Sequence, residues 1–356
     1  MMNKKRREWA DERSHHFHEL NEKIEEWIAA GAFPGCVYGV VGKNTNFSSL
    51  GKSMITPEER VNKLETLYDL ASLTKVVGTV PAILHLIEAG ELTLGTRLAS
   101  ILPEVGESQV TIRHCLTHTS GAPADFSYQG LSGKQALIER AASLLPLEGA
   151  EVICYSDINY ILLGEVIERV SGMSLDQAFD KWIFQPLGMR DTGFDPEHDR
   201  CAPTEVREDR GLVWGQAHDG KAHMMGGISG HAGLFSTGSD IGKFVAGMLE
   251  AAKGDNDAFL SKASIQLMAK NHASSAYDRR GLGWMLPIAG GPMGDYCSDN
   301  SLFHTGFTGG SILLDLDREV GVVLLTNRIH PRRENRMILD LRPKFHNMAI
   351  LALDRM

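Results

Sequence analysis

Residues 70–87 read LASLTKVVGTVPAILHLI, and the chain changes from strand-like to helical patterning within this stretch. Its apolar residues recur at the three-and-four spacing of one helix face: Val76, Val80, Ile83, Leu84 and Ile87. Gly90 predicts the end of this helix, and Pro81 predicts either a kink or a late first turn. Ser72 stands where the helical pattern begins, and Lys75 follows one turn later.

Strand-like segments flank the helical part of the chain on both sides. Residues 36–42 and 47–50 predict a hairpin across Lys43-Asn44, and residues 66–70 predict a short third strand. Toward the C-terminus, three short runs rich in Ile, Leu and Val predict strands at 302–305, 311–316 and 320–326. Helical patterns are found at 14–30, 159–171, 175–184 (stopping before Pro186) and 334–353.

This order predicts an α+β fold. We expect two N-terminal and three C-terminal strands to form one antiparallel sheet, covered by the first and last helices. Residues 1–72 and 235–356 would form the α/β sheet region, and residues 73–234 a mainly helical region. Together the regions would make one compact catalytic unit with a cleft between them.

Composition and charge argue against a nucleic-acid-binding protein and against a membrane-spanning one. The chain has 356 residues and a formal net charge of -9, which argues against a basic nucleic-acid-binding surface. Its apolar runs are too short or too interrupted to span a bilayer. The basic N-terminal start is followed by no apolar region, and the five cysteines are scattered, so we expect a reducing, cytoplasmic location. Oligomeric state is open.

Ser72 and Lys75 are the first candidates for chemistry. A serine hydroxyl needs an adjacent base to act as a nucleophile, and residues three apart on a helix share a face. The helix start also offers backbone N–H groups to a developing oxyanion. A second Ser-x-x-Lys, Ser49 to Lys52, runs from a strand end into a glycine turn, where the side chains need not meet. The alternative for Ser72 is a helix cap beside a solvated lysine.

Two further segments are candidates. Tyr155-Ser156-Asp157 precedes an apolar helix, so a tyrosine near a lysine cation is available as a general base. Asp157 either pairs with Lys75 or caps that helix. The run His304 to Gly310 (HTGFTGG) follows a predicted strand, where glycines permit close approach of a ligand. Taken alone, the first segment is more often a partly buried tyrosine beside a helix cap, and the second is more often a glycine-rich turn.

In this order, the three segments resemble the serine β-lactamase-like superfamily, which uses Ser-x-x-Lys, Tyr-x-Asn and Lys-Thr-Gly or a variant. The closest branch is similar to class C β-lactamases and related penicillin-binding or esterase-type hydrolases. Flanking runs typical of this branch are LTHTSG at 116–121, PLGM at 186–189 and GHAGLFS at 230–236. The resemblance implies a β-lactamase/transpeptidase-like fold and a mechanism without cofactor or metal.

The resemblance also implies roles for individual residues. Ser72 would be acylated, Lys75 would help to deprotonate it, and Tyr155 would shuttle protons. The backbone N–H groups of Ser72 and Phe307 would form the oxyanion hole. Substrate-binding positions would be Asp157, His304, Thr305 and Gly306.

Two positions depart from the family pattern. Asp157 stands where asparagine is usual, and its charge favours a protonated Lys75, which moves the base role toward Tyr155. His304 stands where lysine is usual, so the fixed positive charge suited to a substrate carboxylate is replaced by a mostly neutral imidazole. We therefore expect an esterase or D-amino-acid peptidase acting on a small ester, lactam or short peptide, with at most weak β-lactamase activity.

The sequence leaves two rival interpretations, a metal site and a non-enzymatic binding protein. The chain has 14 histidines, but it lacks a His-Glu-x-x-His motif, and the pair His218-Asp219 is suggestive only in isolation. The other rival is a non-enzymatic protein of the same fold that binds penicillin or peptidoglycan-like peptides. The intact set Ser72, Lys75 and Tyr155 argues against it.

Overall fold

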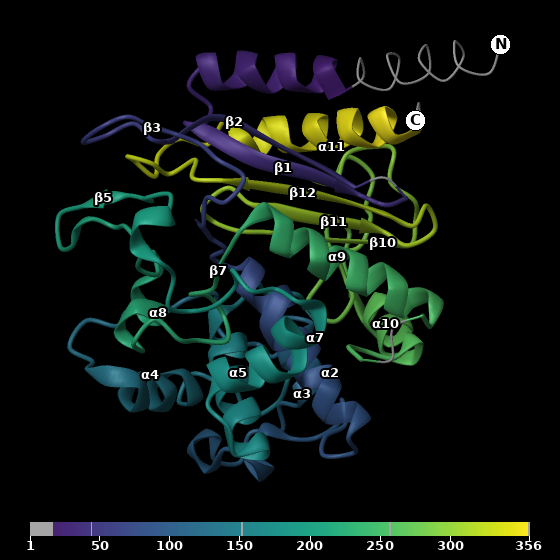
Figure 1. Ribbon diagram of the computed structural model, residues 1–356. Helices are drawn as coiled ribbons and strands as arrows, with labels where there is room; N and C mark the ends of the chain where they lie inside the picture. The colour runs from purple at the N-terminus through teal and green to yellow at the C-terminus, as the bar shows by residue number, and fades with distance from the viewer. Residues whose placement is uncertain (1–16, 44, 151, 256–257, 355–356) are drawn as a thin grey trace.

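The structure is a computed structural model that describes residues 17–43, 45–150, 152–255 and 258–354. Figure 1 shows a sheet with helices on both faces and a largely helical part beneath it. The α+β class and the β-lactamase/transpeptidase-like fold predicted from the sequence are confirmed. The predicted helix at 14–30 is present over residues 17–29, and its first three residues lie outside the described part.

A six-stranded sheet forms the upper layer, in the order β10-β11-β12-β1-β2-β3, and its paired neighbours are antiparallel. Its strands are β1 (Gly35–Val41), β2 (Asn46–Met54), β3 (Arg60–Val61), β10 (Ser301–Thr305), β11 (Ser311–Asp315) and β12 (Val320–Thr326). The central pair joins the two ends of the chain, with Cys36 opposite Thr326. The two N-terminal and three C-terminal strands that were predicted to form one sheet all belong to it, and β3 is added at its edge.

Helices cover both faces of the sheet (Figure 1). The helix over 17–29 and α11 (Ile338–Asp354) lie on one face, and α9 (Gly238–Lys253) lies on the other. Side chains of β1 therefore alternate between two apolar layers: Tyr38 packs with the terminal helices and Val37 with the core under α9. Because both faces are covered, every residue of β1 is buried, as in a central strand of a two-sided sheet.

The other elements are short. The predicted strand at 66–70 is β4 (Tyr68–Asp69), which pairs with β7 (Phe235–Ser236) outside the main sheet. The remaining helices are α2 (Val80–Glu88), α3 (Ile112–Leu116), α4 (Gly133–Ala142), α5 (Asp157–Ser171), α6 (Leu175–Phe179), α7 (Gln185–Leu187), α8 (Gly220–Met224) and α10 (Lys262–Ala269). The remaining strands are β5 (Val206–Arg207), β6 (Gly211–Leu212), β8 (Ala273–Ser274) and β9 (Arg279–Arg280), and short 3-10 turns cover Leu98–Ser100, Pro103–Val105 and His198–Arg200.

Two π-turns explain how proline is accommodated within helices. The turn η1 (Lys75–Thr79) leads into α2, and the N–H of Val80 reaches back five residues to the carbonyl of Lys75, directly before Pro81. The turn η4 (Asp180–Phe184) leads into α7 in the same way, directly before Pro186. Proline lacks an N–H and its ring clashes with the carbonyl four residues earlier, so a widened turn relieves both problems. The predicted helix end before Pro186 is therefore wrong, because helix continues to Leu187.

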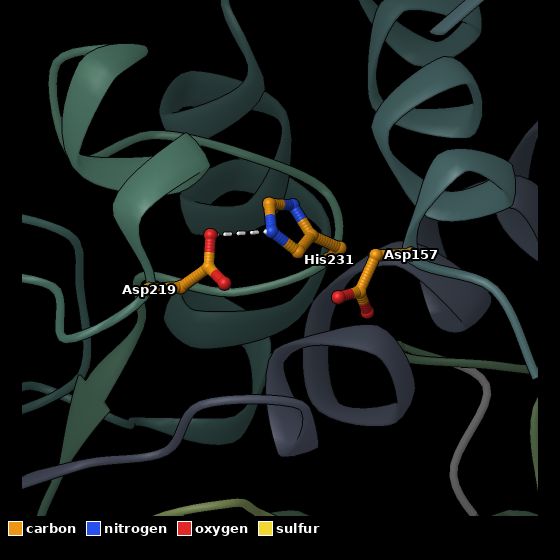
Figure 2. A group of neighbouring side chains, drawn as sticks. All are labelled: Asp157, Asp219 and His231. Carbon is orange, nitrogen blue, oxygen red and sulfur yellow. Dashed lines mark hydrogen bonds and ion pairs between the residues drawn. The ribbon is translucent and has the colours of Figure 1, made fainter. Parts of the chain in front are cut away.

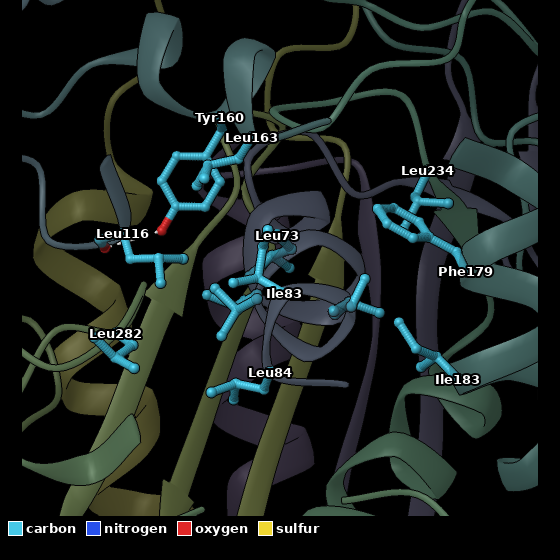
Figure 3. Packing of buried hydrophobic residues seen from close by; sticks show 14 of the residues in the cluster. Leu73, Ile83, Leu84, Leu116, Tyr160, Leu163, Phe179, Ile183, Leu234 and Leu282 are labelled. Atoms are coloured by element: carbon cyan, nitrogen blue, oxygen red, sulfur yellow. Dashed lines mark hydrogen bonds between the residues drawn. The ribbon is translucent and has the colours of Figure 1, made fainter. Parts of the chain in front are cut away.

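The core below the sheet is built around α2 and α5. Figure 3 shows Leu73, Ile83 and Leu84 at its centre, with Leu116, Tyr160 and Leu163 on one side and Phe179 and Ile183 on the other. Gly78 allows the closest approach, since a Cβ built there would lie 2.1 Å from Cε2 of Phe179. The predicted division into a sheet region and a helical region stays a prediction; α9 and α10 show that the C-terminal part also contains helices.

Among the residues that the structure describes, we find no helix with the length and apolar character needed to cross a bilayer.

Candidate active site

Ser72 lies at the junction between β4 and the helix that contains Lys75. The preceding residue, Ala71, has φ +46°, a left-handed conformation that costs a non-glycine residue about 1–3 kcal/mol. Asp69 supports this turn with both carboxylate oxygens: one accepts the N–H of Ala71 at 2.7 Å, and the other accepts the N–H of His218 at 2.7 Å. The turn therefore holds Ser72 directly before the first helical residue, Leu73.

Lys75 is fully buried, and its ammonium group donates three hydrogen bonds. The acceptors are Asp157 Oδ1 at 2.8 Å, Ser72 Oγ at 3.0 Å and the carbonyl oxygen of His231 at 3.0 Å. Three acceptors satisfy all three donors of a lysine ammonium. Burial by itself lowers the pKa of Lys75, but the neighbouring Asp157 and Tyr155 more than compensate, so the pKa is raised and the group is charged at neutral pH.

Asp157 is the first residue of α5, and its carboxylate faces Lys75 rather than capping the helix. Burial raises the pKa of Asp157, whereas the charges of Lys75 and His231 lower it, and the net pKa lies below the usual range. Lys75 and Asp157 therefore form a buried ion pair. The second Ser-x-x-Lys lies on β2, where Lys52 pairs instead with Glu59 at 2.6 Å.

The ring of Tyr155 lies among two cations and two imidazoles. Lys75 Nζ is 5.1 Å from its centroid, and the guanidinium carbon of Arg280 is 5.9 Å from it. The ring of His118 lies tilted against it with centroids 4.4 Å apart, and the centroid of the His304 ring is 6.3 Å away. The phenol ring therefore lies in an electropositive surrounding.

Both imidazoles are neutral. Burial, reinforced by the charges of Arg280 and Lys75, holds the pKa of His118 well below its usual value. Burial and the same two cations act alike on the pKa of His304. His304 lies on β10 and its Nδ1 is 2.9 Å from the carbonyl oxygen of Thr305. The expectation that this position has no fixed positive charge agrees with this pKa direction.

The loop after β10 is tied to the segment before Ser72. Thr308 Oγ1 donates to the carbonyl oxygen of Asp69 at 2.7 Å, and a Cβ at Gly306 would lie 2.5 Å from the carbonyl oxygen of Leu70. Within the described part of the chain, the backbone N–H groups of Ser72 and Phe307 donate to no protein acceptor. Both N–H groups are therefore available to a ligand oxygen.

A chain of polar residues behind Lys75 was not singled out from the sequence. His231 lies between the carboxylates of Asp157 and Asp219 (Figure 2), and its Nε2 is 2.8 Å from Asp219 Oδ1. Its Nδ1 is 2.8 Å from Ser229 Oγ. His231 and Asp219 lie in irregular segments without periodicity, so no helix or strand spacing in the sequence connects them with Ser72 and Lys75. Arg280 had no sequence signal of its own.

Asp157, Asp219 and His231 form a group whose donor atoms lie within 4.8 Å of one another, as metal ligands do. These donors are already engaged: Asp157 accepts from Lys75, and Asp219 accepts from His231 and from the N–H groups of Lys221 and Ala222. The arrangement is therefore an ion-pair and hydrogen-bond network among the described residues, rather than an open metal cage.

Comparison with known proteins agrees with this geometry. Residues 20–342 match the profile of the β-lactamase family. A protein of Escherichia coli K12 named "Putative D-alanyl-D-alanine carboxypeptidase" is 32% identical over 310 residues, which cover 74% of this chain and 70% of that protein.

Two solved structures share the fold. EstCE1, described as a hydrolase with promiscuous acyltransferase activity, has a TM-score of 0.76 at 20% identity and covers 96% of this chain and 98% of its own. A class C β-lactamase from Rhodobacter sphaeroides has a TM-score of 0.73 at 20% identity, with coverages of 94% and 99%. The resemblance inferred from the motifs is thereby confirmed, and the chain belongs to the β-lactamase family of serine hydrolases.

Proposed function

We propose that this protein hydrolyses carboxylic esters or amides through an acyl-enzyme formed on Ser72. The observation that carries the proposal is the fully satisfied ammonium of Lys75, which donates to Ser72 Oγ at 3.0 Å while Asp157 keeps it charged. A charged lysine cannot accept the serine proton, but it stabilises the alkoxide that forms when another group takes that proton.

Tyr155 is the group we assign to proton transfer. Ser72 Oγ attacks the carbonyl carbon of the substrate, its proton passes to the Tyr155 oxygen, and the N–H groups of Ser72 and Phe307 stabilise the resulting oxyanion. The phenolic proton of Tyr155 passes to the leaving group as the bond between that group and the carbonyl carbon breaks. Water then attacks the acyl-enzyme: a water proton passes to the Tyr155 oxygen, the phenolic proton returns to Ser72 Oγ, and the acid is released. The electropositive surroundings of the Tyr155 ring support this assignment.

The expected substrates are small esters, strained lactams or short peptides with D-amino acids. The neutral imidazole of His304 supports esters over penicillins, because no fixed charge at that position pairs with a lactam carboxylate. Thr305 and Gly306 at the end of β10 would line the substrate side. The name of the E. coli relative supports the peptidase class, and the description of EstCE1 supports the ester class.

The second candidate is a non-enzymatic binder of penicillin or peptidoglycan-like peptides. Nothing in the geometry of Ser72, Lys75 and Tyr155 favours it, since a binder has no need for a charged lysine on a serine hydroxyl. For the location we propose the cytoplasm. This is supported by the five cysteines, which are all free thiols.

Hydrolysis of p-nitrophenyl butyrate by the wild type and by Ser72→Ala tests the proposal. We expect turnover in the wild type, loss of at least about 10³-fold in the variant, and a mass increase of one acyl group on Ser72 in quenched wild-type samples. Equal rates in the two proteins would refute it. Labelling by fluorescent penicillin without any ester, amide or lactam turnover would favour the binder.

A further inference from the structure

The segment Ser229–Leu234 threads between α5 and the helix that contains Lys75. Thr79 Oγ1 donates to the carbonyl oxygen of Gly230 at 2.6 Å, and Lys75 Nζ donates to that of His231 at 3.0 Å. The packing leaves no room for a side chain at Gly230, because a Cβ there would lie 2.3 Å from the carbonyl oxygen of Tyr160. The segment therefore presents consecutive carbonyl groups to one face of that helix.

The carbonyl group of His231 limits the rotation of the Lys75 ammonium group. An ammonium group rotates freely about its last carbon–nitrogen bond unless its hydrogens are bonded. Asp157 holds one hydrogen, and the carbonyl oxygen of His231 holds a second. With two hydrogens fixed, the third points at Ser72 Oγ. A displaced carbonyl would let the ammonium group turn away from the serine, which a static ion pair with Asp157 alone does not prevent.

The imidazole of His231 is anchored at both nitrogens. Asp219 Oδ1 lies 2.8 Å from Nε2, and Ser229 Oγ lies 2.8 Å from Nδ1. Asp219 is itself held by the backbone N–H groups of Lys221 and Ala222, at 3.0 and 2.9 Å, where it caps α8. The ring is 1% exposed, so it has no freedom to leave these partners without disturbing its own backbone.

The chain Asp219–His231–Ser229 has the residue types of a hydrolytic triad but cannot serve as a second nucleophilic centre. Ser229 is 1% exposed and therefore closed to substrate. This chain contacts Lys75 through the backbone carbonyl of His231, and the imidazole of His231 lies beside the Asp157 carboxylate. Because its contact with Lys75 is one hydrogen bond from the ammonium group, this chain is suited to positioning Lys75 rather than to making or breaking bonds in the substrate.

We propose that Asp219, His231 and Ser229 form a positioning unit that orients the Lys75 ammonium toward Ser72, by anchoring the imidazole whose backbone carbonyl accepts from Lys75. This inference rests on the proposed function, since it concerns the same nucleophile. The three residues act through Lys75 and do not touch the substrate.

Asp219→Ala removes the anchor at Nε2, and Asp219→Asn keeps an oxygen that accepts the same hydrogen bond. We expect Asp219→Ala to lower kcat for p-nitrophenyl butyrate by about 10- to 100-fold with KM within about twofold, because misplacement of about 1 Å costs about 10²-fold. Asp219→Asn should restore kcat to within about threefold of the wild type. A wild-type kcat in Asp219→Ala, or an equal loss in both variants, would overturn the proposal.

Asp240→Ala is the matched control. Asp240 is a buried carboxylate in the first turn of α9 and accepts the N–H of Asp191 at 2.6 Å, with no contact to the candidate active site. It should lower the melting temperature without changing kcat. Should Asp219→Ala fail to fold, Ser229→Ala removes the other anchor and should lower kcat at least about threefold; an unchanged kcat there would contradict the proposal.

A second measurement does not depend on turnover. Urea unfolding of Asp219→Ala, Lys75→Met and the double variant forms a cycle, and we expect the free energies of unfolding to be non-additive, since positioned groups are coupled. Additive values would overturn the positioning unit. Failure of the proposed function is recognised separately, because Ser72→Ala would then hydrolyse the ester as fast as the wild type, whatever the cycle shows.

Discussion

Asp157→Asn is the most informative perturbation of the buried ion pair, because it removes one charge and keeps the shape. In the wild type the raised pKa of Lys75 means that folding favours the charged lysine, and this stabilisation is present below the lysine's unfolded pKa of about 10.4 and is lost only as pH rises through the folded value. In the variant, burial acts on Lys75 without its anionic partner at 2.8 Å, so we expect the pKa of Lys75 to fall below the unfolded value.

The loss of unfolding free energy caused by Asp157→Asn has an upper limit, and that limit depends on pH. Leaving a buried charge without its partner costs about 3–5 kcal/mol. Lys75 escapes this cost by losing its proton, which costs about 1.36 kcal/mol for each pH unit below about 10.4. The ceiling is therefore about 4.6 kcal/mol at pH 7 and about 1.9 kcal/mol at pH 9. We expect Asp157→Asn to lose about 3–4.6 kcal/mol at pH 7 and no more than about 2 kcal/mol at pH 9.

The assay is urea unfolding of the wild type and Asp157→Asn at pH 7, 8 and 9, with the difference in unfolding free energy taken at each pH. Asp315→Asn is the control: this buried carboxylate accepts the N–H and hydroxyl of Ser298, and its ion-pair partner at 3.6 Å is an arginine, Arg318, rather than a lysine. Its penalty should stay constant. A loss of less than about 1 kcal/mol at pH 7, or a loss that does not shrink by pH 9, would refute the reasoning.

Three further outcomes are expected. Lys75→Ala should lower kcat/KM for p-nitrophenyl butyrate at least about 10²-fold, and a smaller loss would remove Lys75 from the mechanism. His304→Lys should speed acylation by benzylpenicillin about 10- to 100-fold, measured by stopped assay with fluorescent penicillin, because a charged donor to a carboxylate contributes about 1.5–3 kcal/mol; no gain would mean that this position does not meet the lactam carboxylate. Gly78→Ala should destabilise folding by about 1–3 kcal/mol in urea, since its Cβ would lie 2.1 Å from Phe179, and an unchanged midpoint would contradict that packing.

The strands and long helices were predictable because their apolar residues are periodic. β1, β11 and β12 and the helices at 17–29 and 338–354 lie close to their predicted ranges, whereas β2 runs four residues past its predicted end. The helix end before Pro186 was not predictable, because proline is normally a stop signal and only the neighbouring packing shows that a π-turn admits it. A pattern of hydrophobicity contains no information about such a local widening.

Sequence alone determined which residues deserved attention at the candidate active site. Ser72 and Lys75 are three residues apart at the start of one helix, so the proximity of their side chains follows from local helix geometry. The roles assigned to Tyr155, Phe307 and the other site residues stay predictions.

Tertiary structure alone decided the charge and the orientation of Lys75. Its other two acceptors, Asp157 and the carbonyl of His231, lie 82 and 156 residues further along the chain, and the second of them is held by Asp219. No local rule connects positions that far apart. Their approach depends on how α5 and the segment Ser229–Leu234 pack around one helix, and that packing excludes the water that would otherwise solvate the ammonium group.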